Sequence, residues 1–477
     1  MKSSEAAYVN SVRNAESFGI KDKVGYFLGD LGFNSLQVLV NTYLMLFCVN
    51  IIGIEAIHFS IIIFICKALD ALNDTFIGRV VDLRPGSKHG KFKPFIWWFA
   101  IPYAISTIIL FANISATPYW FKIVYCVGIY FIWGVVGTFI NVPYGAMVNS
   151  MTSNQMERTE LSNARSVGSL GANIITTTIA PLILFDAMNN PVAGRFIHLA
   201  LILSVFTVIC LAVTHKLCRE RIVVSISKEN AEEKEKIDYL KVIKTFAKNR
   251  PMIAVVVAYI VAKFFLQTTG LTNQYVFMTY FQDTGKLAAI GLGTLVPMVL
   301  AMICLKPLVK LFGKKKMITV PFVIAAILYA VLAIFPVSAG AWIIIQLVAS
   351  FFTGFFSLLV WSLIADAVDY QAYLSGARND GTVYATITFL VFFISSLSTS
   401  LIAVLLDAVG YDASLGSMQA ANVANNIKTM AGILPTIGCI LIFICFFVIY
   451  NMNDEKMKEI SAYVNKQSEK LEESFDK

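Results

Sequence analysis

The stretch GILPTIGCILIFICFFVIY, residues 432–450, contains no Lys, Arg, Asp or Glu. Residues 97–113, 196–213 and 317–335 are equally free of these four residue types. A helix needs about 20 predominantly apolar residues to cross the hydrocarbon core of a bilayer. Because runs of this length recur along the chain, the sequence predicts a protein that crosses the membrane many times.

The overall composition indicates the same class. Of the 477 residues, 57% are hydrophobic and only 14% are charged, and the mean hydropathy is +0.71. Soluble domains average about 45–50% apolar and about 25% charged residues. These values exclude a soluble enzyme, a disordered chain and a nucleic-acid-binding protein. The formal net charge of +8 comes from Lys and Arg in short loops between apolar runs, as membrane topology requires.

The N-terminus and the cysteines allow two further predictions. Residues 1–23 are polar and of mixed charge, without the apolar core of a cleavable signal. The eight cysteines show no CxxC or metal-ligand spacing, so we interpret them as small buried hydrophobic residues; they stand at positions 48, 66, 126, 210, 218, 304, 439 and 445.

The apolar runs predict an all-α membrane protein with 12 transmembrane helices. Their approximate limits are 24–48, 54–78, 94–113, 119–148, 162–185, 196–215, 252–281, 287–311, 317–337, 341–369, 381–407 and 430–450. A charged segment divides these spans into six and six. We therefore expect a cytoplasmic N-terminal segment (1–23), an N-terminal six-helix bundle (24–215), a cytoplasmic linker (216–251), a C-terminal six-helix bundle (252–450) and a cytoplasmic tail (451–477).

Lys and Arg determine the expected orientation. They cluster in the loops at 79–93 and 306–316, whereas four outer loops hold one each, at Lys122, Arg195, Lys286 and Lys428. Since cytoplasmic loops carry the excess of Lys and Arg, we expect both termini and the linker in the cytoplasm.

The two basic loops follow the second and the eighth predicted span. In both, a glycine precedes the basic cluster, in HGKFKPF and in FGKKKM. Matched loops in two six-helix halves are typical of a duplicated transporter, whose site lies near the midplane between the halves. The alternative, that every short inner loop is basic, explains the charge but not the matched position.

Charged residues inside a span are costly and mark functional sites. In the second span, Lys67, Asp70 and Asp74 share one helix face, and Asn73 adds a neutral oxygen beside them. Two carboxylates one turn apart repel each other unless a cation lies between them or one is protonated. This pattern predicts a site for a coupling cation, Na⁺, Li⁺ or H⁺. The alternative is a structural Lys67–Asp70 ion pair, which leaves Asp74 unexplained.

The first span carries a polar stripe of Asp30, Asn34, Gln37 and Asn41. Amides on one face, beside aromatic rings, favour contact with a sugar, although they could instead bond to neighbouring helices. Thr138, Asn141 and Tyr144 lie on the fourth span and Arg165 on the fifth. A single intramembrane arginine is either a ligand clamp or the partner of an acidic group, and the sequence leaves both open.

The C-terminal half adds further candidates. Asp366 and Asp369 lie near the inner end of the tenth span, and Lys263 lies about halfway along the seventh. Lys263 could hold an anionic group of the substrate or pair with one of these two aspartates. Trp361 on the tenth span and Tyr384 and Thr388 on the eleventh complete the set.

Five motifs occur together in this order: KALDALNDTFIGRVVD, GKFKPF, NVPYGAM, ERTELSNARS and IADAVDY…GARNDG. With them, residues 24–450 resemble the glycoside–pentoside–hexuronide:cation symporter family of the major facilitator superfamily. The resemblance implies a major facilitator superfamily fold and alternating access between its halves. It also implies symport of a sugar or glycoside with Na⁺, Li⁺ or H⁺.

The resemblance also implies roles for individual residues. The cation site, with Na⁺ as the expected ion, would comprise Asp70, Asn73, Asp74 and Thr138. The sugar site would draw on Asn34, Lys67, Asn141 and Arg165. The pattern of polar and aromatic residues described above adds the other substrate-binding candidates, Gln37, Asn41, Tyr144, Lys263, Trp361, Tyr384 and Thr388. The inner-gate candidates are Lys91, Arg158, Asp366, Asp369 and Arg378.

The chain departs from the melibiose-transporting members of that family at two positions. Those members have acidic residues where this chain has Asn34 and Asn141. Two acids would repel an anionic sugar, so the asparagines favour a hexuronide or a neutral pentoside over melibiose. The family also commonly has a lysine where this chain has Phe392, which weakens the case for a substrate with a carboxylate.

The sequence therefore predicts a cation-coupled sugar symporter in the inner or plasma membrane, without an enzymatic cofactor. The expected partners are a small sugar or glycoside and the lipid bilayer, and no nucleic acid. One alternative is an exporter of a drug or metabolite on the same fold. The other is a non-transporting membrane sensor that binds a cytosolic partner through residues 216–250 or 451–477.

Overall fold

The computed structural model describes residues 17–84, 86–87, 90–152, 154–222, 249–375, 397–452 and 460. Across these ranges the chain is helical, and its only β-type pairings are two isolated bridges, Ser87–Gly90 and Phe185–Pro191. The chain divides into two compact units, each of which is described by itself. The first comprises Met1–Glu235, Gln282–Leu292 and Ala403–Gln419, and the second Lys236–Phe281, Gly293–Ile402 and Ala420–Lys477.

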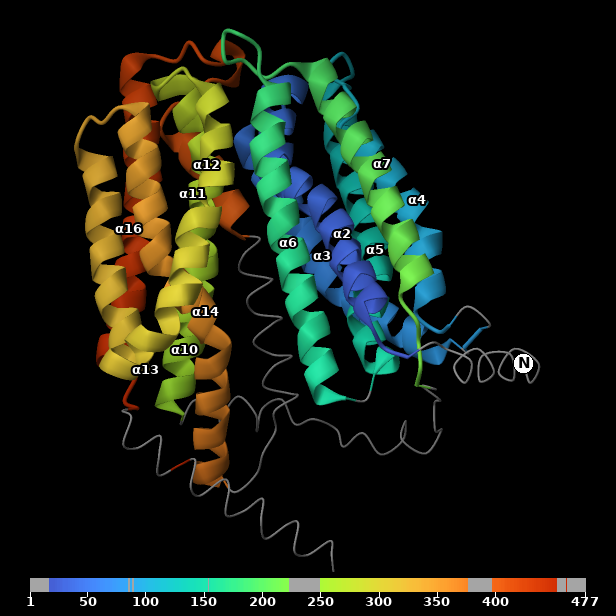
Figure 1. Cartoon of the computed structure of the whole chain (residues 1–477). Helices are drawn as coiled ribbons and strands as arrows, with labels where there is room; N and C mark the ends of the chain where they lie inside the picture. The colour runs from blue at the N-terminus through green and yellow to red at the C-terminus, as the bar shows by residue number, and fades with distance from the viewer. Residues whose placement is uncertain are drawn as a thin grey trace, which may run out of the picture. The chain divides into compact units, whose positions relative to one another are not determined.

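The first unit is built mainly from six long helices (Figure 1). They are α2 (Ile20–Phe47, continued by the π-helix Cys48–Ile52), α3 (Ala56–Leu83), α4 (Lys93–Leu110), α5 (Tyr119–Met151), α6 (Gln155–Leu184) and α7 (Ala193–Leu217). Three short helices follow in segments that join this unit later in the chain: 3-10 turns at Thr284–Lys286 and Ala413–Leu415, and α12 (Leu287–Gly293).

The second unit contains the remaining helices. They are α10 (Arg250–Val261), a π-helix (Ala262–Leu266), α11 (Gln267–Tyr275), a second π-helix (Val276–Tyr280), α13 (Leu295–Ile334), α14 (Ala339–Ser375) and α16 (Ala421–Ile444, continued by the π-helix Cys445–Ile449). A further apolar helix covers Leu397–Ala408, at the boundary of the two units.

Local signals determine where several of these helices begin and break. The side chains of Asn154 and Asn249 accept hydrogen bonds from the first turns of α6 and α10. Gly313 interrupts α13 with a φ of 77°, in the left-handed region that favours glycine. This break separates the two spans that the sequence predicts over 287–311 and 317–337.

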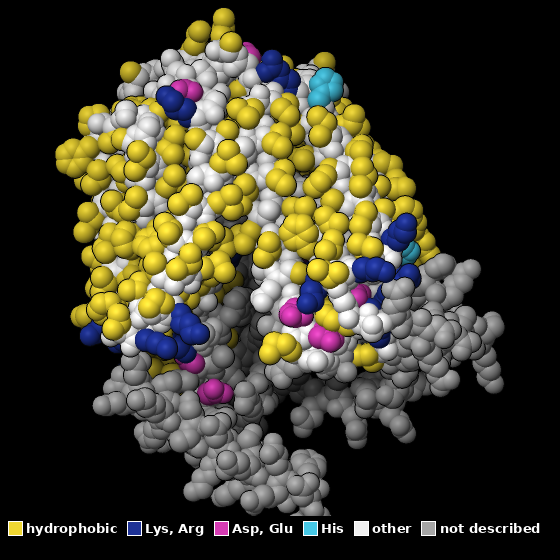
Figure 2. Space-filling model, in the orientation of Figure 1, with side chains coloured by type: hydrophobic (Ala, Val, Ile, Leu, Met, Phe, Trp, Pro, Cys, Tyr) yellow, Lys and Arg dark blue, Asp and Glu magenta, His cyan; other side chains and the backbone are white. Residues whose placement is uncertain are grey.

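Nine helices in the part of the chain described are long and apolar enough to cross a membrane. On the face drawn in Figure 2, hydrophobic side chains cover the middle of the helices, whereas Lys and Arg gather toward their ends. A fully apolar outer surface is costly in water but suits a lipid environment. The chain is therefore a multi-pass membrane protein.

Several limits differ from the expected ones: α3 continues to Leu83 rather than 78, and α14 continues to Ser375 rather than 369. The helix expected at 162–185 begins earlier, at Gln155, because the Asn154 cap stabilises a polar first turn that hydropathy does not reveal. Segments 282–292 and 403–419, expected in the C-terminal bundle, group instead with the first unit. Hydrogen bonds attach them there: Asn189 Oδ1 accepts from Thr284 (N, 2.8 Å), and Asn190 Oδ1 accepts from Ser417 (N, 2.8 Å).

Close packing of α2 against α7 fixes the frame of the first unit. A Cβ atom at Gly32 would lie 2.6 Å from Cβ of Cys210, and one at Gly25 would lie 2.9 Å from Sγ of Cys218. The hydroxyl of Thr207 donates to the carbonyl of Gly32 at 2.8 Å. Small residues allow this approach of two membrane helices, and threonine hydroxyls join them. The glycines of the GYFLGDLG stretch therefore position α2, whose other face carries Asp30 and Asn34.

Candidate functional site

A charged cluster joins α2, α5 and α6 inside the first unit. Arg165 of α6 donates from Nε to Oδ1 of Asp30 on α2 and from Nη2 to Oδ1 of Asn141 on α5, both at 3.1 Å. Asn34, one turn after Asp30, donates from Nδ2 to the second carboxylate oxygen at 2.8 Å. We call Asp30, Asn34, Asn141 and Arg165 the arginine cluster. Three of its members are predicted substrate-binding residues. The fourth, Asp30, belongs to the polar stripe of the first span, and the sequence alone gives it no ligand.

Two stacked tyrosines lie beside the arginine cluster. The rings of Tyr26 and Tyr144 are 4.4 Å apart between centroids, and the Arg165 guanidinium lies 5.3 Å from the Tyr144 ring centre. Each tyrosine hydroxyl donates to the backbone carbonyl of the other residue. The Tyr144 hydroxyl, predicted to bind substrate, is thus already bonded within the protein, and its ring supports the arginine.

The predicted cation site lies on α3 and α5. Nζ of Lys67 is 3.6 Å from Oδ2 of Asp70 and 5.6 Å from the ring centre of Tyr130. Oδ1 of Asp70 lies against α5, where a Cβ atom at Gly134 would be only 2.4 Å away. Thr138, one turn further along α5, donates to the carbonyl of Gly134 at 3.1 Å. Asp70 and Thr138 therefore both contact Gly134.

Asn73 and Asp74 complete the predicted set on α3. Nδ2 of Asn73 is buried and has no hydrogen-bond partner among the described residues. Asp74 lies on the same helix, but its side chain is outside the described part of the chain. Within that part, no group of three or more His, Cys, Asp and Glu residues could hold a metal ion. A site here would instead have to combine carboxylate with amide, hydroxyl or backbone oxygens.

The amide pair further along α2 is less engaged. Asn41 donates to Oε1 of Gln37 at 3.4 Å, and Nε2 of Gln37 lies 3.8 Å from the position of a Cβ at Gly137. Gln37 is half-buried and Asn41 is exposed. Both side chains retain donors and acceptors for a ligand.

In the second unit, the predicted residues divide between two places. Asp366 forms an ion pair with Lys314, which also donates to the hydroxyl of Ser362 at 2.9 Å. The alternative in which Lys263 pairs with Asp366 is therefore not realised, because a lysine of the basic loop takes that position. Lys263 lies on the π-helix after α10, exposed, with Nζ 5.8 Å from the ring centre of Tyr259. π-Helical turns occur frequently at functional sites.

Several predictions fall outside the described part of the chain. These are the side chain of Trp361, all of Arg378, Tyr384, Thr388 and Phe392, most of the 216–251 linker and nearly all of the tail. Asp369 lies on α14 and is half-buried.

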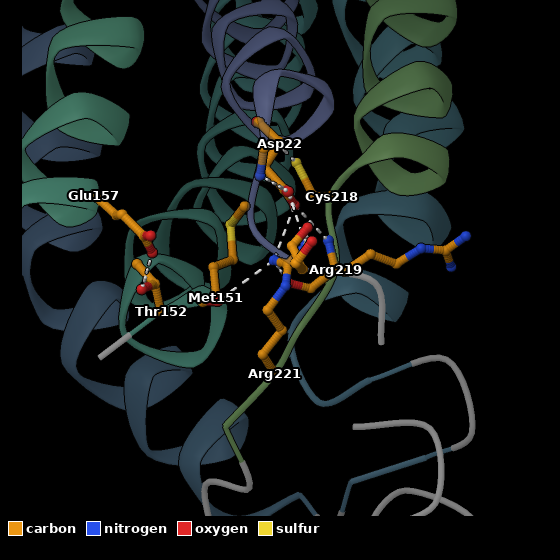
Figure 3. Close-up of polar contacts among 9 residues, drawn as sticks. Asp22, Met151, Thr152, Glu157, Cys218, Arg219 and Arg221 are labelled. Carbon is orange, nitrogen blue, oxygen red and sulfur yellow. Dashed lines mark hydrogen bonds and ion pairs between the residues drawn. The ribbon is translucent and has the colours of Figure 1, made fainter. Parts of the chain in front are cut away.

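A second charged cluster lies where α7 ends (Figure 3). Arg221 donates from Nη2 to Asp22 at 2.8 Å and from Nη1 to the carbonyl of Met151 at 3.4 Å. The backbone N–H of Arg219 also donates to Asp22, at 3.2 Å. Residues 218–222, expected to begin the linker, are therefore bound to the first unit.

Glu220 in the same segment fixes the start of α4. Its carboxylate accepts the backbone N–H groups of Lys91, Phe92 and Lys93 at 2.9, 2.9 and 3.1 Å. The first N–H groups of a helix have no partner within the helix, and a carboxylate there also complements the helix dipole. The sequence signal for this contact is the charged stretch RER (219–221) directly after the sixth span. In the sequence this stretch looks like the start of an ordinary charged linker.

The gate candidates near this end are placed by the same segments. Lys91 is buried, with its backbone bonded to Glu220. Arg158 donates from Nε to the carbonyl of Thr152 at 2.8 Å, and Thr152 in turn donates to Glu157. Figure 3 shows Thr152 and Glu157 on the side of Met151 away from Cys218. Arg158 thus binds the end of α5, whereas Lys91 lies in the segment that Glu220 holds at the start of α4.

The four basic residues that the sequence predicts in outer loops all have partners within their own unit. Three of them satisfy helix ends, and the fourth forms an ion pair with an aspartate three residues earlier. The contacts are Lys122 with the carbonyl of Ile52, Arg195 with those of Phe185 and Ile183, Lys428 with that of Ala333, and Lys286 with Asp283. Because cations stabilise the C-terminal ends of helices, each has a structural reason to lie where it does.

Known proteins resemble this chain along nearly its whole length. A family model described as "MFS/sugar transport protein" matches residues 25–454. The uncharacterised symporter YjmB of Bacillus subtilis (strain 168) is 27% identical, over 98% of this chain and 100% of its own length. The isoprimeverose transporter of Lactiplantibacillus pentosus is 27% identical, over 87% and 86%, respectively.

Two other similarities bear on transport direction and on the fold. A putative 2,3-dihydroxypropane-1-sulfonate exporter of Salmonella typhimurium (strain LT2) is 26% identical, over 91% of this chain and 93% of its own. Among solved structures, a bacterial homologue of the human lysosomal transporter Spinster, inward-facing and unoccupied, matches with a TM-score of 0.63. The two sequences are 11% identical, and the match covers 93% of this chain and 98% of the Spinster homologue. The fold is that of the major facilitator superfamily.

Proposed function

The chain belongs to the MFS/sugar transport protein family, the glycoside–pentoside–hexuronide transporters, and from this premise we propose that it is a symporter that couples sugar or glycoside uptake to a cation gradient. As a membrane transporter it is not an enzyme. The proposal adds to the family assignment the coupling cation, the direction of transport and the residues that bind each ligand.

The arginine cluster supports the sugar site. Asn34 and Asn141 offer amide groups, and Arg165 offers a guanidinium that is 37% exposed although it lies within a membrane helix. Such groups bind the hydroxyls of a sugar, and the stacked Tyr26 and Tyr144 stiffen the site. Gln37, Asn41 and Lys67 extend it within the first unit. Lys263, Trp361, Tyr384 and Thr388 are proposed to contribute from the second half of the chain.

One observation carries the cation proposal: the Asp70 carboxylate inside a membrane helix lies directly against Gly134, whose carbonyl accepts the hydroxyl of Thr138. Hard alkali ions prefer oxygen ligands such as carboxylate, amide and hydroxyl groups. The buried amide of Asn73 has an unpartnered atom, and a rotation of the amide would bring Oδ1 to that position. With Asp74 these residues would bind Na⁺, or alternatively Li⁺ or H⁺.

The inner ends of the helices are proposed to form the gate. Lys91, Arg158, Asp366, Asp369 and Arg378 would exchange ion pairs as the two halves alternate. The Lys314–Asp366 pair is an example of such a contact within one unit. Because ion pairs at this side break and reform, they would set the energy difference between the inward-open and outward-open states.

The local contacts of the four outer-loop cations favour the proposed topology. Apart from Lys122, Arg195, Lys286 and Lys428, most Lys and Arg residues lie in the loops at 79–93 and 306–316, in the linker at 216–251 and in the two terminal segments. The positive-inside rule then gives two six-helix halves, 24–215 and 252–450, with both termini in the cytoplasm of a cell whose inner or plasma membrane holds the protein.

Uptake measurements with Asp70→Asn and Asp74→Cys test this function. In proteoliposomes with an imposed cation gradient, both variants should lose concentrative uptake while sugar exchange at equal concentrations persists. Asp283→Asn is the control, because Asp283 pairs with Lys286 in an exposed outer loop. Wild-type accumulation of sugar by Asp70→Asn would show that the cation binds elsewhere.

The second candidate is export, which the relative named as a putative exporter favours. The two functions differ in the sign of the coupling. For a symporter, an inward cation gradient drives the sugar inward, whereas for an exporter that exchanges cation for substrate the same gradient drives the substrate outward. Measuring the direction of flux in vesicles of known orientation decides between them.

A further inference from the structure

Asp30 is the most enclosed member of the arginine cluster. Its side chain is 3% exposed, whereas that of Arg165 is 37% exposed. Both carboxylate oxygens are bonded, one to Arg165 and the other to Asn34. A ligand that approaches this cluster therefore meets the guanidinium, with the carboxylate held behind it.

The packing of α6 on α2 fixes this order. Gly168 lies one turn after Arg165, and a Cβ atom there would be 2.5 Å from the carbonyl oxygen of Phe27 and 3.2 Å from Cβ of Asp30. Contact between Asn141 and the second guanidinium nitrogen holds Arg165 from the other side. The close approach of the two helix backbones at Gly168 keeps Asp30 in the interface, where Arg165 and Asn34 enclose it.

The arginine cluster consequently presents a compensated charge. Asp30 balances Arg165, because the two side chains form an ion pair at 3.1 Å. Neutral hydroxyls can bond to the guanidinium and to the two amides without any change in this balance. A carboxylate on the sugar would instead be placed close to the fixed negative charge of Asp30, and leaving water would cost it more than the compensated arginine returns.

We infer that Asp30 determines the charge specificity of the proposed sugar site, and that the site selects uncharged glycosides over sugar anions. The inference rests on the proposed sugar transport and names its substrate class.

A matched pair of ligands tests it, because a β-xyloside is the corresponding β-glucuronide without its carboxylate. Affinities of p-nitrophenyl β-xyloside and p-nitrophenyl β-glucuronide are measured by titration calorimetry on the purified full-length protein at saturating Na⁺. The wild type should bind the xyloside at least about tenfold more tightly. A unit charge about 7 Å away, at an effective dielectric constant of about 20, changes affinity by roughly 10- to 50-fold. Asp30→Asn should therefore shift the ratio of affinities toward the glucuronide by roughly that factor.

Two variants separate charge from structure. Asp30→Glu keeps the negative charge and should keep the preference of the wild type. Asp22→Asn lies on the same helix and also breaks a buried ion pair, with Arg221, so it should leave the ratio unchanged.

The outcomes are distinct. Equal wild-type affinity for the two sugars, or an unchanged ratio in folded Asp30→Asn, would overturn the inference while sugar transport stands. If Asp30→Asn does not fold, the wild-type ratio alone decides. A wild type that neither binds nor transports any sugar would overturn the proposed function itself, and this inference with it.

Discussion

Replacing Gly134 by alanine places a methyl group 2.4 Å from Oδ1 of Asp70. An ordinary contact between these atoms needs about 3.4 Å, so the carboxylate has to retreat by about 1 Å. The backbone of α5 cannot give way as readily, because Tyr103 lies against it one turn later, at Gly137. The substitution therefore moves one proposed cation ligand while leaving its charge in place.

The loss of affinity follows from the displacement. At an effective dielectric constant of about 20, moving a unit negative charge from about 2.4 to about 3.4 Å from a monovalent cation costs about 2 kcal/mol. This is a factor of about 30 in the dissociation constant of the cation. The variant should thus need a roughly 30-fold higher Na⁺ concentration for half-maximal stimulation of uptake.

The assay measures initial sugar uptake into proteoliposomes over a range of external Na⁺ concentrations. Gly128→Ala is the matched control: it lies on the same helix, changes helix propensity equally, and its new methyl group would meet no atom within 4 Å. It should retain the Na⁺ dependence of the wild type. A normal Na⁺ dependence in Gly134→Ala would refute the placement of the cation beside Asp70.

Three further predictions concern the frame of the protein. Glu220→Gln removes the negative charge and one hydrogen-bond acceptor from the start of α4, so the unfolding free energy in detergent should fall by about 1–3 kcal/mol. Glu160→Gln, which removes one partner of an exposed ion pair with Lys23, should change this free energy little. Burial raises the pKa of the Cys218 thiol to about 12, so N-ethylmaleimide at pH 8 should leave Cys218 unmodified in the folded protein while it labels the more accessible Cys304, as read by peptide mass spectrometry. Asn273→Leu breaks a pair of hydrogen bonds between the side-chain amides of Asn273 and Gln346, and it should lower the unfolding free energy by about 1–2 kcal/mol, measured as a fall in the thermal midpoint. The double variant with Gln346→Leu should recover part of the loss.

Hydropathy predicts the membrane-embedded parts of the fold well, because in lipid each span must be apolar and must satisfy its own backbone. The helix expected at 196–215 is observed as Ala193–Leu217. Hydropathy fails where a helix leaves the membrane. The first turns of α6 are polar and are held by the Asn154 cap, a contact with no apolar signature.

The candidate site was predictable in its residue types but not in its pairings. The sequence leaves open whether Arg165 clamps a ligand or pairs with an acid, and the structure pairs it with Asp30, 135 positions away. No local spacing encodes a contact between two helices so far apart in sequence. The sequence shows that Gly134 lies one turn before Thr138 on the same helix face. Only the structure shows that the Asp70 carboxylate occupies the space that a side chain at Gly134 would fill.

Glu220 shows a different limit. It stands just after an apolar span, where a charged residue is the ordinary sign of a loop. Its three backbone contacts depend on the distance between the ends of α4 and α7, which is a property of the fold.

The most direct test of the account is uptake of a labelled β-xyloside into proteoliposomes that contain the wild-type protein, under an imposed inward Na⁺ gradient and, separately, under a pH gradient alone. Cation-coupled symport predicts accumulation of the sugar above its external concentration, driven by Na⁺ and abolished when the Na⁺ gradient is collapsed. Equilibration without accumulation under both gradients, or outward movement of the sugar, would contradict cation-coupled symport.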